Sequence, residues 1–166
     1  RAMKDFLLNT AKLLLLAVLA VMLWKIAGGA QSQTSFEEVK KSVEASMGTE
    51  ELKQADAQLL RRLYGLNSGE LKSWTLWTAS DNMAVEELLL VECTSQEQLA
   101  QIKEAAGKRA DVQHDNFAGY APEQVKMIDS AAVCAEYPYL LFSVSDHAEK
   151  VKHDFLKSLY PLHSGG

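Results

Sequence analysis

The sequence predicts an α+β domain built on a four-stranded, mainly antiparallel sheet with helices packed on one face. Two observations support this class. The period of the apolar residues changes along the chain from helical to strand-like and back. The strand-like runs also come in two pairs joined by short loops, which only antiparallel strands allow. The resulting ββα–ββα order follows two N-terminal helices, and a hydrophobic N-terminal helix precedes them all.

That first helix is the clearest signal for location. Leu13 to Trp24 are twelve consecutive apolar residues, preceded by Arg1, Lys4 and Lys12 and followed by the small residues 27–30. Residues 1–30 are therefore predicted to be a signal peptide or a membrane anchor, and an ordinary core helix is a third alternative. As a helix the run is only about 18 Å long, shorter than a bilayer core of roughly 30 Å. The preceding positive charges predict that the domain crosses the membrane.

Residues 31–35 are predicted to be a linker, residues 36–160 a single domain and residues 161–166 a tail. Apolar residues at helical spacing predict a helix from Phe36 to Met47, with Ser35 as N-cap in a capping box and Gly48 at its end. A second helical stretch begins at Leu52 and ends near residues 64–66.

The rest of the domain alternates strand pairs with helices. Strands are expected at 71–79 and 87–93, and again at 131–136 and 139–145 around a tight turn. A long helix capped by Ser95 or Thr94 and a short helix from Pro122 separate the pairs. Asp146 is expected to cap the last helix, whose inward residues are Ala148, Val151, Phe155 and Leu159.

The alternation along the strands predicts a second apolar sheet face. If Leu89 faces the helices, then its neighbours in the strand face the other way. Trp74 and Trp77 have opposite parity, so one of them must join this second face. The candidate interaction surface consists of Trp74, Trp77, Leu88, Leu90, Tyr139 and Leu141. Either the N-terminal helices cover it, or it meets a protein partner or a second copy.

Charge and motifs exclude several function classes. After residue 30 the chain keeps 13 basic and 21 acidic residues, a net charge of −8, which argues against nucleic acid as a partner. Cys93 and Cys134 lie in apolar runs and are expected to be buried thiols, with a disulfide as the alternative. No motif indicates a cofactor, a metal site or catalytic residues. His114 beside Asp115 is expected to be structural, with a general base as the alternative.

Four phrases carry a resemblance to a bacterial family catalogued as domain of unknown function 4358. They lie at residues 64–66, 86–90, 117–124 and 139–146, in this order. The resemblance implies a small secreted or membrane-tethered domain of Gram-positive bacteria, often a lipoprotein. This chain lacks a cysteine just after the apolar run, so lipidation is not expected. The family implies no activity.

These observations favour a non-catalytic binding or interaction module, held at the cell membrane through the N-terminal segment with the domain outside, or secreted. The alternative is a small extracytoplasmic hydrolase whose site is assembled across the fold, around His114. A third possibility is an intracellular domain on a reversed anchor, which requires the charge bias to fail.

Overall fold

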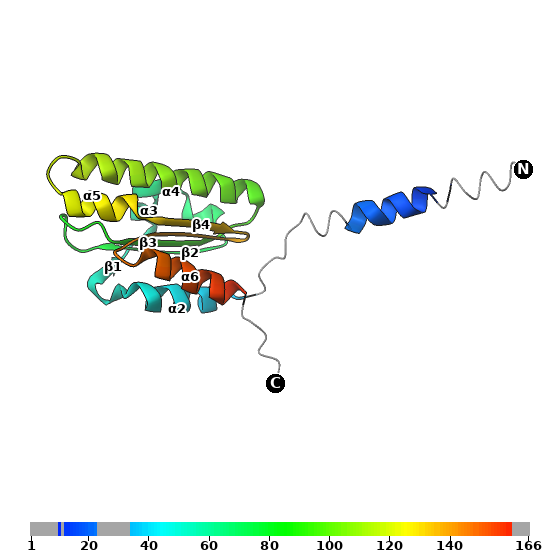
Figure 1. Cartoon of the computed structure of the whole chain (residues 1–166), viewed down its shortest axis with the longest axis horizontal. Helices are drawn as coiled ribbons and strands as arrows, with labels where there is room; N and C mark the ends of the chain where they lie inside the picture. The colour runs from blue at the N-terminus through cyan, green and yellow to red at the C-terminus, as the bar shows by residue number, and fades with distance from the viewer. Residues whose placement is uncertain (1–9, 11, 23–33, 161–166) are drawn as a thin grey trace, which may run out of the picture. The chain divides into compact units, whose positions relative to one another are not determined.

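The computed structural model describes residues 10, 12–22 and 34–160 (Figure 1). The chain separates into two compact units, Arg1–Gln31 and Ser32–Gly166. In the first unit residues 12–22 are helical, and their leucine side chains are exposed. Among the described residues, no helix combines the length and hydropathy that crossing a membrane requires. The predicted leader end at residues 28–30, linker residues 31–33 and the tail at 161–166 lie outside the described residues.

The second unit is an α+β domain with a five-stranded sheet in the order β1-β2-β3-β5-β4, in which all neighbouring strands are antiparallel. The strands are β1 (Leu52–Gln54), β2 (Ser73–Ala79), β3 (Glu87–Glu92), β4 (Ala132–Glu136) and β5 (Tyr139–Val144). The predicted strand count of four was wrong, because β1 lies in the segment expected to begin the second helix. Leu52 pairs with Ala79 of β2 instead.

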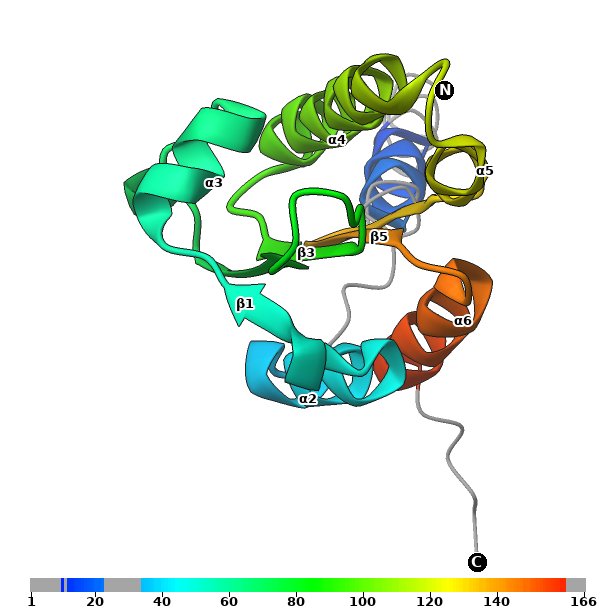
Figure 2. The ribbon, with the colours of Figure 1, turned by 90° about the vertical axis from the view of Figure 1, so that its left-hand side faces the viewer.

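Helices cover both faces of the sheet (Figure 2). On one face α2 (Phe36–Met47) and α6 (Ala148–Leu159) form a core with Leu88 and Leu90. On the other, α3 (Ala57–Tyr64), α4 (Gln96–Phe117) and α5 (Pro122–Asp129) form a core with Leu89. The prediction of helices on one face was therefore wrong. The reason is that β3 is apolar on both sides, and each side must be removed from water.

The N-caps predicted at Ser35 and Ser95 are confirmed, whereas the one predicted at Asp146 is wrong. The hydroxyl of Ser35 accepts a hydrogen bond from the backbone N–H of Glu38, and Ser35 N–H donates to the Glu38 carboxylate at 3.1 Å. The capping box is therefore confirmed. Ser95 caps α4. Asp146 does not cap α6, because the N-cap position is occupied by His147, which makes no side-chain capping bond. Short 3₁₀ turns occupy Thr49–Glu51 and Ser68–Glu70.

Candidate functional site

The predicted interaction surface is covered in this structure. Leu88, Leu90, Tyr139 and Leu141 are at most 1% exposed and pack against α2 and α6. Helices therefore cover this face, which was one of the two alternatives. The covering helices differ from the predicted ones. The first N-terminal helix, α2, lies on this face together with the C-terminal α6, whereas α3 packs on the opposite face.

The two tryptophans lie on opposite faces, as their parity predicts. Trp77 packs half-buried against the core under α2, and its Nε1 donates to a carboxylate oxygen of Glu44 at 2.7 Å. Trp74 packs against the core under α4. Of the six candidate residues, five share one face and Trp74 does not belong with them. The strand parity is confirmed, and Trp77 is the one partly exposed aromatic residue among these five.

The two cysteines are buried, and His114 contacts a carboxylate of the neighbouring helix. Cys93 and Cys134 are free, buried thiols in two different cores, on opposite sides of the sheet. Burial raises the pKa of the Cys93 thiol to about 11. His114 does not pair with the neighbouring Asp115. Its Nδ1 lies 2.8 Å from a carboxylate oxygen of Asp129, so the histidine links α4 to α5.

Two hollows flank the loop between β2 and β3, residues 80–86. The first, which we call the acidic crevice, has a volume of about 370 Å³. Four chain segments meet there: the end of α2 with the following turn, the β2–β3 loop, the end of α5 and the β5–α6 connection. Its polar side chains are Glu51, Ser80, Asp81, Glu86, Ser145, Asp146 and His147. Loops that converge at one end of a sheet are a common place for binding sites.

Three of the four carboxylates of the acidic crevice have no basic partner among the described residues, and the fourth, Asp146, contacts the ring of His147. None of the lining residues is Lys or Arg, and no ion pair joins Glu51, Asp81 or Glu86 to a base within residues 34–160. Asp81 accepts a hydrogen bond from the N–H of Met83 at 2.9 Å, and Glu86 accepts one from the N–H of Val85 at 3.1 Å. In the described part of the chain, no three acidic, histidine or cysteine residues gather closely enough to hold a metal ion.

A serine and a histidine also line the crevice. Ser145 is only 2% exposed, and its Oγ has no hydrogen-bond partner among the described residues. His147 Nδ1 contacts the Asp146 carboxylate, and its Nε2 lies 3.3 Å from the carbonyl oxygen of Met47. Both ring nitrogens are therefore occupied, and neither is bonded to Ser145. No hydrogen bond therefore joins Ser145 to His147 in the described part of the chain.

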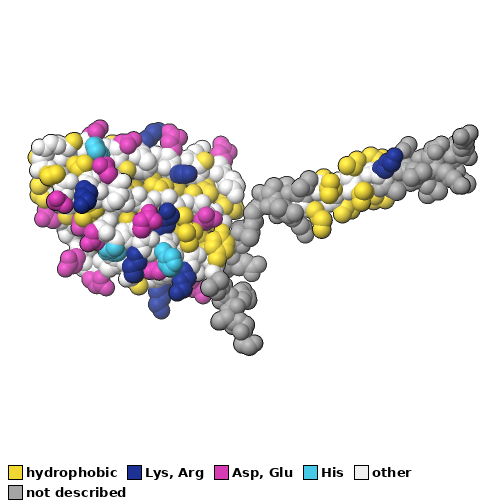
Figure 3. All heavy atoms as spheres, in the orientation of Figure 1, with side chains coloured by type: hydrophobic (Ala, Val, Ile, Leu, Met, Phe, Trp, Pro, Cys, Tyr) yellow, Lys and Arg dark blue, Asp and Glu magenta, His cyan; other side chains and the backbone are white. Residues whose placement is uncertain are grey.

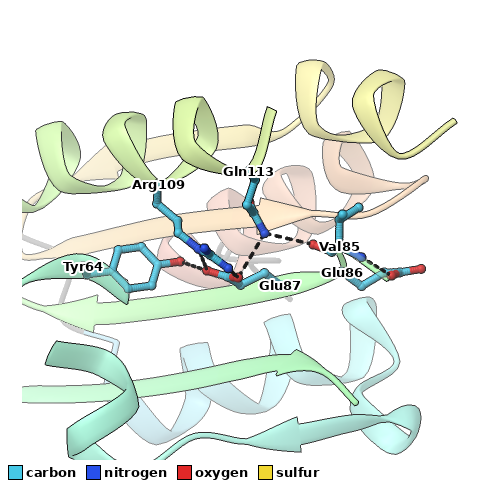
Figure 4. A network of polar contacts seen from close by, with 6 residues as sticks. All are labelled: Tyr64, Val85, Glu86, Glu87, Arg109 and Gln113. Carbon is cyan, nitrogen blue, oxygen red and sulfur yellow. Dashed lines mark hydrogen bonds and ion pairs between the residues drawn. The ribbon is translucent and has the colours of Figure 1, made fainter. Parts of the chain in front are cut away.

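The second hollow lies between α3, α4 and the same loop and has a volume of about 330 Å³. Glu87, which is 1% exposed, lines it together with Arg109 and Gln113 of α4 (Figure 4). Arg109 donates to both oxygens of Glu87, through Nε at 3.0 and 3.2 Å and through Nη2 at 2.6 Å. Gln113 Nε2 adds a hydrogen bond at 3.2 Å, and the Tyr64 hydroxyl donates to the same carboxylate.

The protonation of this cluster follows from its burial. Burial, with the nearby Glu87 charge, raises the pKa of Tyr64 well above its usual value, so the phenol stays a hydrogen-bond donor. Burial works against the charge on Arg109, but the hydrogen bonds and attraction of Glu87 outweigh it and raise the pKa of the guanidinium. The Glu87 carboxylate is thus satisfied from within the protein. The cluster joins α3 and α4 to β3.

A family model described as a domain of unknown function, DUF4358, matches residues 44–145. The chain belongs to the DUF4358 family. This confirms the resemblance carried by the four sequence phrases. The match spans all five strands, the Glu87 cluster and most of the acidic crevice, and it stops one residue before Asp146. Comparison with curated proteins and with solved structures finds no match.

Sequence reasoning did not find the acidic crevice. Glu51, Asp81, Glu86 and Asp146 come from segments up to 95 positions apart, and each is an ordinary surface carboxylate in its own neighbourhood. Glu87 did leave a signal, because it is a charged residue that opens the apolar strand β3. A charge on a strand that is buried on both faces needs a partner from another element.

Proposed function

We propose that this domain is a non-catalytic binding module that takes a cationic organic group into the acidic crevice. The observation that supports the proposal is a hollow lined by four carboxylates and by neither lysine nor arginine, in which only Asp146 contacts a basic side chain of the described residues, that of His147. A lysine or arginine side chain of a protein partner has the charge and length to enter such a hollow. The volume of about 370 Å³ lies within the usual range for ligand pockets.

The polar groups favour an organic cation over a metal ion. The carboxylates are spread around the rim and are not gathered at coordination distance. An ammonium or guanidinium group can satisfy several such oxygens at once, because it carries three or more N–H donors. The Ser145 hydroxyl, buried and unpartnered, would gain a hydrogen bond if a donor reached the base of the crevice.

The proposed location is outside the cytoplasm, either tethered to the membrane or released. Support comes from the apolar run Leu13–Trp24 with Arg1, Lys4 and Lys12 before it. Protease added to intact, wall-stripped cells should digest a tethered domain, and the culture medium should contain a released one. Full protection inside the cells would contradict the location and leave the crevice proposal untouched.

The binding proposal is tested by an NMR titration of the isotope-labelled chain from Gln31 onward. The probe is blocked hexalysine in low salt, and blocked hexaserine is the uncharged control. We expect hexalysine to shift the backbone amides of residues 80–86 and 145–147. The double substitution Asp81→Asn and Glu86→Gln keeps an oxygen acceptor for each backbone N–H but removes two charges. It should weaken binding about tenfold.

The matched control removes two charges elsewhere. Glu97 and Asp115 are exposed on α4 and line neither hollow, so Glu97→Gln with Asp115→Asn changes the net charge equally. Hexalysine affinity should stay within about twofold of the parent. Equal weakening by both double variants would show that only net charge matters, and the crevice proposal would fail. If hexalysine shifted only backbone amides outside residues 80–86 and 145–147, the crevice proposal would also fail.

A further inference from the structure

The two edge strands of the sheet, β1 and β4, differ in how well they are protected against pairing with a strand of another chain. At one edge, β1 is three residues long and exposes Lys53 and Gln54. At the other, β4 is five residues long and contains neither Lys nor Pro. Its one charge is Glu136, at the last position, and the Tyr160 hydroxyl donates to that carboxylate at 3.0 Å. Proteins usually protect long edge strands with charges, prolines or bulges. Within β4, Glu136 at the last position is the one such device, and residues 132–135 carry none.

The register of β4 shows which backbone groups point outward. The carbonyl of Pro138 accepts a hydrogen bond from Cys93 N–H, so even-numbered residues of β5 bond toward β3. Odd-numbered residues therefore bond toward β4, where Cys134 lies opposite Leu141. Val133 and Ala135 alternate with these positions, so their N–H and C=O groups point away from the sheet. Both side chains are partly exposed.

Partly exposed apolar side chains lie beside this edge, together with a few charged ones. In Figure 1 β4 runs along the near side of the domain between α5 and α6, and Figure 3 shows hydrophobic side chains on the surface toward the right of this strip. Tyr137 and Leu156 are partly exposed beside the edge, and Tyr160 is 46% exposed. An apolar strip along a free strand edge is a template for strand pairing.

We infer that β4 pairs antiparallel with β4 of a second copy of this chain, across a two-fold axis at Cys134. Val133 of one copy then lies opposite Ala135 of the other, and these outward residues exchange their N–H and C=O bonds. The two sheets become one continuous sheet. Such a contact is isologous, because the same strand serves on both sides. The interface lies at the sheet edge, whereas the sequence had suggested the sheet face that α2 and α6 cover.

The charges beside the edge suit a second copy. On the α6 side of β4, Glu149 and Lys152 form an ion pair at 3.5 Å, and both act electrostatically on Cys134. A two-fold axis at Cys134 brings this pair next to its own equivalent. Glu136 and Lys103 also act on Cys134, so each copy offers two acidic and two basic groups near the axis, and neither sign faces only like charge.

The arrangement makes a specific chemical prediction. At the axis the two Cys134 residues are a non-hydrogen-bonded antiparallel pair, whose Cα atoms lie about 4.5 Å apart. That separation lies within the range that a disulfide spans. Treating the full chain with copper(II)–phenanthroline at pH 9 should therefore join two chains. The two thiols release two protons, and two copper(II) ions accept the two electrons. The product is a disulfide dimer on a non-reducing gel.

Four substitutions test whether the cross-link and the dimer form through β4. Cys134→Ser should abolish the cross-link, and Cys93→Ser should leave it unchanged. Ala135→Lys places a charge at a partly exposed edge position whose side chain lies on the α4 side of the sheet. In a chain whose circular dichroism matches the parent, it should abolish both the cross-link and the dimer seen by sedimentation of the full chain in density-matched detergent. Ala118→Lys adds the same charge at an exposed site at the end of α4 and should leave both unchanged.

Sedimentation makes the test independent of cysteine reactivity. A parent chain that sediments as a monomer at about 100 μM would overturn the inference, since useful pairing at that concentration needs a dissociation constant below it. An Ala135→Lys chain that dimerises as strongly as the parent would also overturn it, because the contact would then lie elsewhere. A cross-link that persists in Cys134→Ser would exclude the proposed axis.

Discussion

Removing Arg109 should destabilise the domain strongly, because it leaves the Glu87 carboxylate buried without its countercharge. Arg109→Met keeps most of the side-chain volume, but it removes three hydrogen bonds from a carboxylate that is 1% exposed. Breaking a buried ion pair from one side costs about 3–5 kcal/mol. The Arg109 side chain is 15% exposed, so water can partly replace it. We expect a loss of about 3 kcal/mol, at the lower end of that range.

Removing the carboxylate as well should recover much of this loss. In Arg109→Met with Glu87→Leu, no unpaired charge is left, but the buried Tyr64 hydroxyl loses its acceptor at a cost of about 1–2 kcal/mol. Adding Tyr64→Phe removes that hydroxyl. The triple variant should lie within about 1 kcal/mol of the parent, because apolar replacements of buried ion pairs are often neutral.

Urea unfolding of the chain from Gln31, followed by circular dichroism at pH 7, measures these free energies. Lys108→Met is the control, since it removes a positive charge from the neighbouring position. The Lys108 side chain is 72% exposed, and it pairs with Glu104 at 2.6 Å. Its loss should cost less than about 0.5 kcal/mol. A cost for Arg109→Met as small as that of the control would refute the reasoning. The reasoning would also be refuted if Arg109→Met with Glu87→Leu lost as much unfolding free energy as the single variants Arg109→Met and Glu87→Leu lose together.

Three further predictions concern the cores and the α2–α6 contact. Leu89→Asp or Phe142→Asp should abolish the cooperative thermal transition, because each places an unpaired charge at a position with 0% exposure; a parent-like melting temperature would contradict the strand parity. Trp77→Ala should lower the unfolding free energy by about 3 kcal/mol, whereas Trp77→Phe should cost about 1 kcal/mol for the hydrogen bond to Glu44. Little change for Trp77→Ala would mean that α2 does not pack on this side chain. Hydrogen bonds from Lys150 and Ser46 lower the pKa of the Asp154 carboxyl from 3.8 to about 2. Because the folded pKa is depressed, this group stabilises the domain above pH 4 and loses that effect as the pH falls toward 2. Asp154→Asn should therefore cost about 1 kcal/mol at neutral pH after allowance for solvent screening, and its unfolding free energy should converge with the parent's between pH 4 and pH 2. A pH-independent difference would exclude this contribution.

Local patterns in the sequence predicted most elements of the domain because the forces that define those elements are local. The helix spacing from Phe36 to Met47 and the cap at Ser35 depend on residues within one or two turns. Strand alternation likewise placed Leu88 and Leu89 on opposite faces, as the two cores confirm. These signals do not depend on the rest of the chain.

The missed features depend on contacts between distant residues. Leu52 and Leu59 are seven positions apart, which fits a helix, yet Leu52 belongs to a strand that exists only because it pairs with β2. Helix periodicity identified the inward residues of α6 but did not show which sheet face they meet. The acidic crevice is assembled from four segments. Their spacing in the sequence follows no helix or strand period, so periodicity could not predict that they meet.

The antiparallel contact between α2 and α6 has a consequence for how the domain can be attached. Thr34 donates through its hydroxyl to the carbonyl of Ser158 at 3.0 Å, so the two ends of the domain meet (Figure 1). The acidic crevice lies at the other end of α2, beside Met47, about 18 Å away along twelve helical residues. A fluorescent protein or a surface linker joined at either end would therefore start from the same corner. Neither would begin near the crevice, so immobilised chains can be assayed for ligand capture without blocking it.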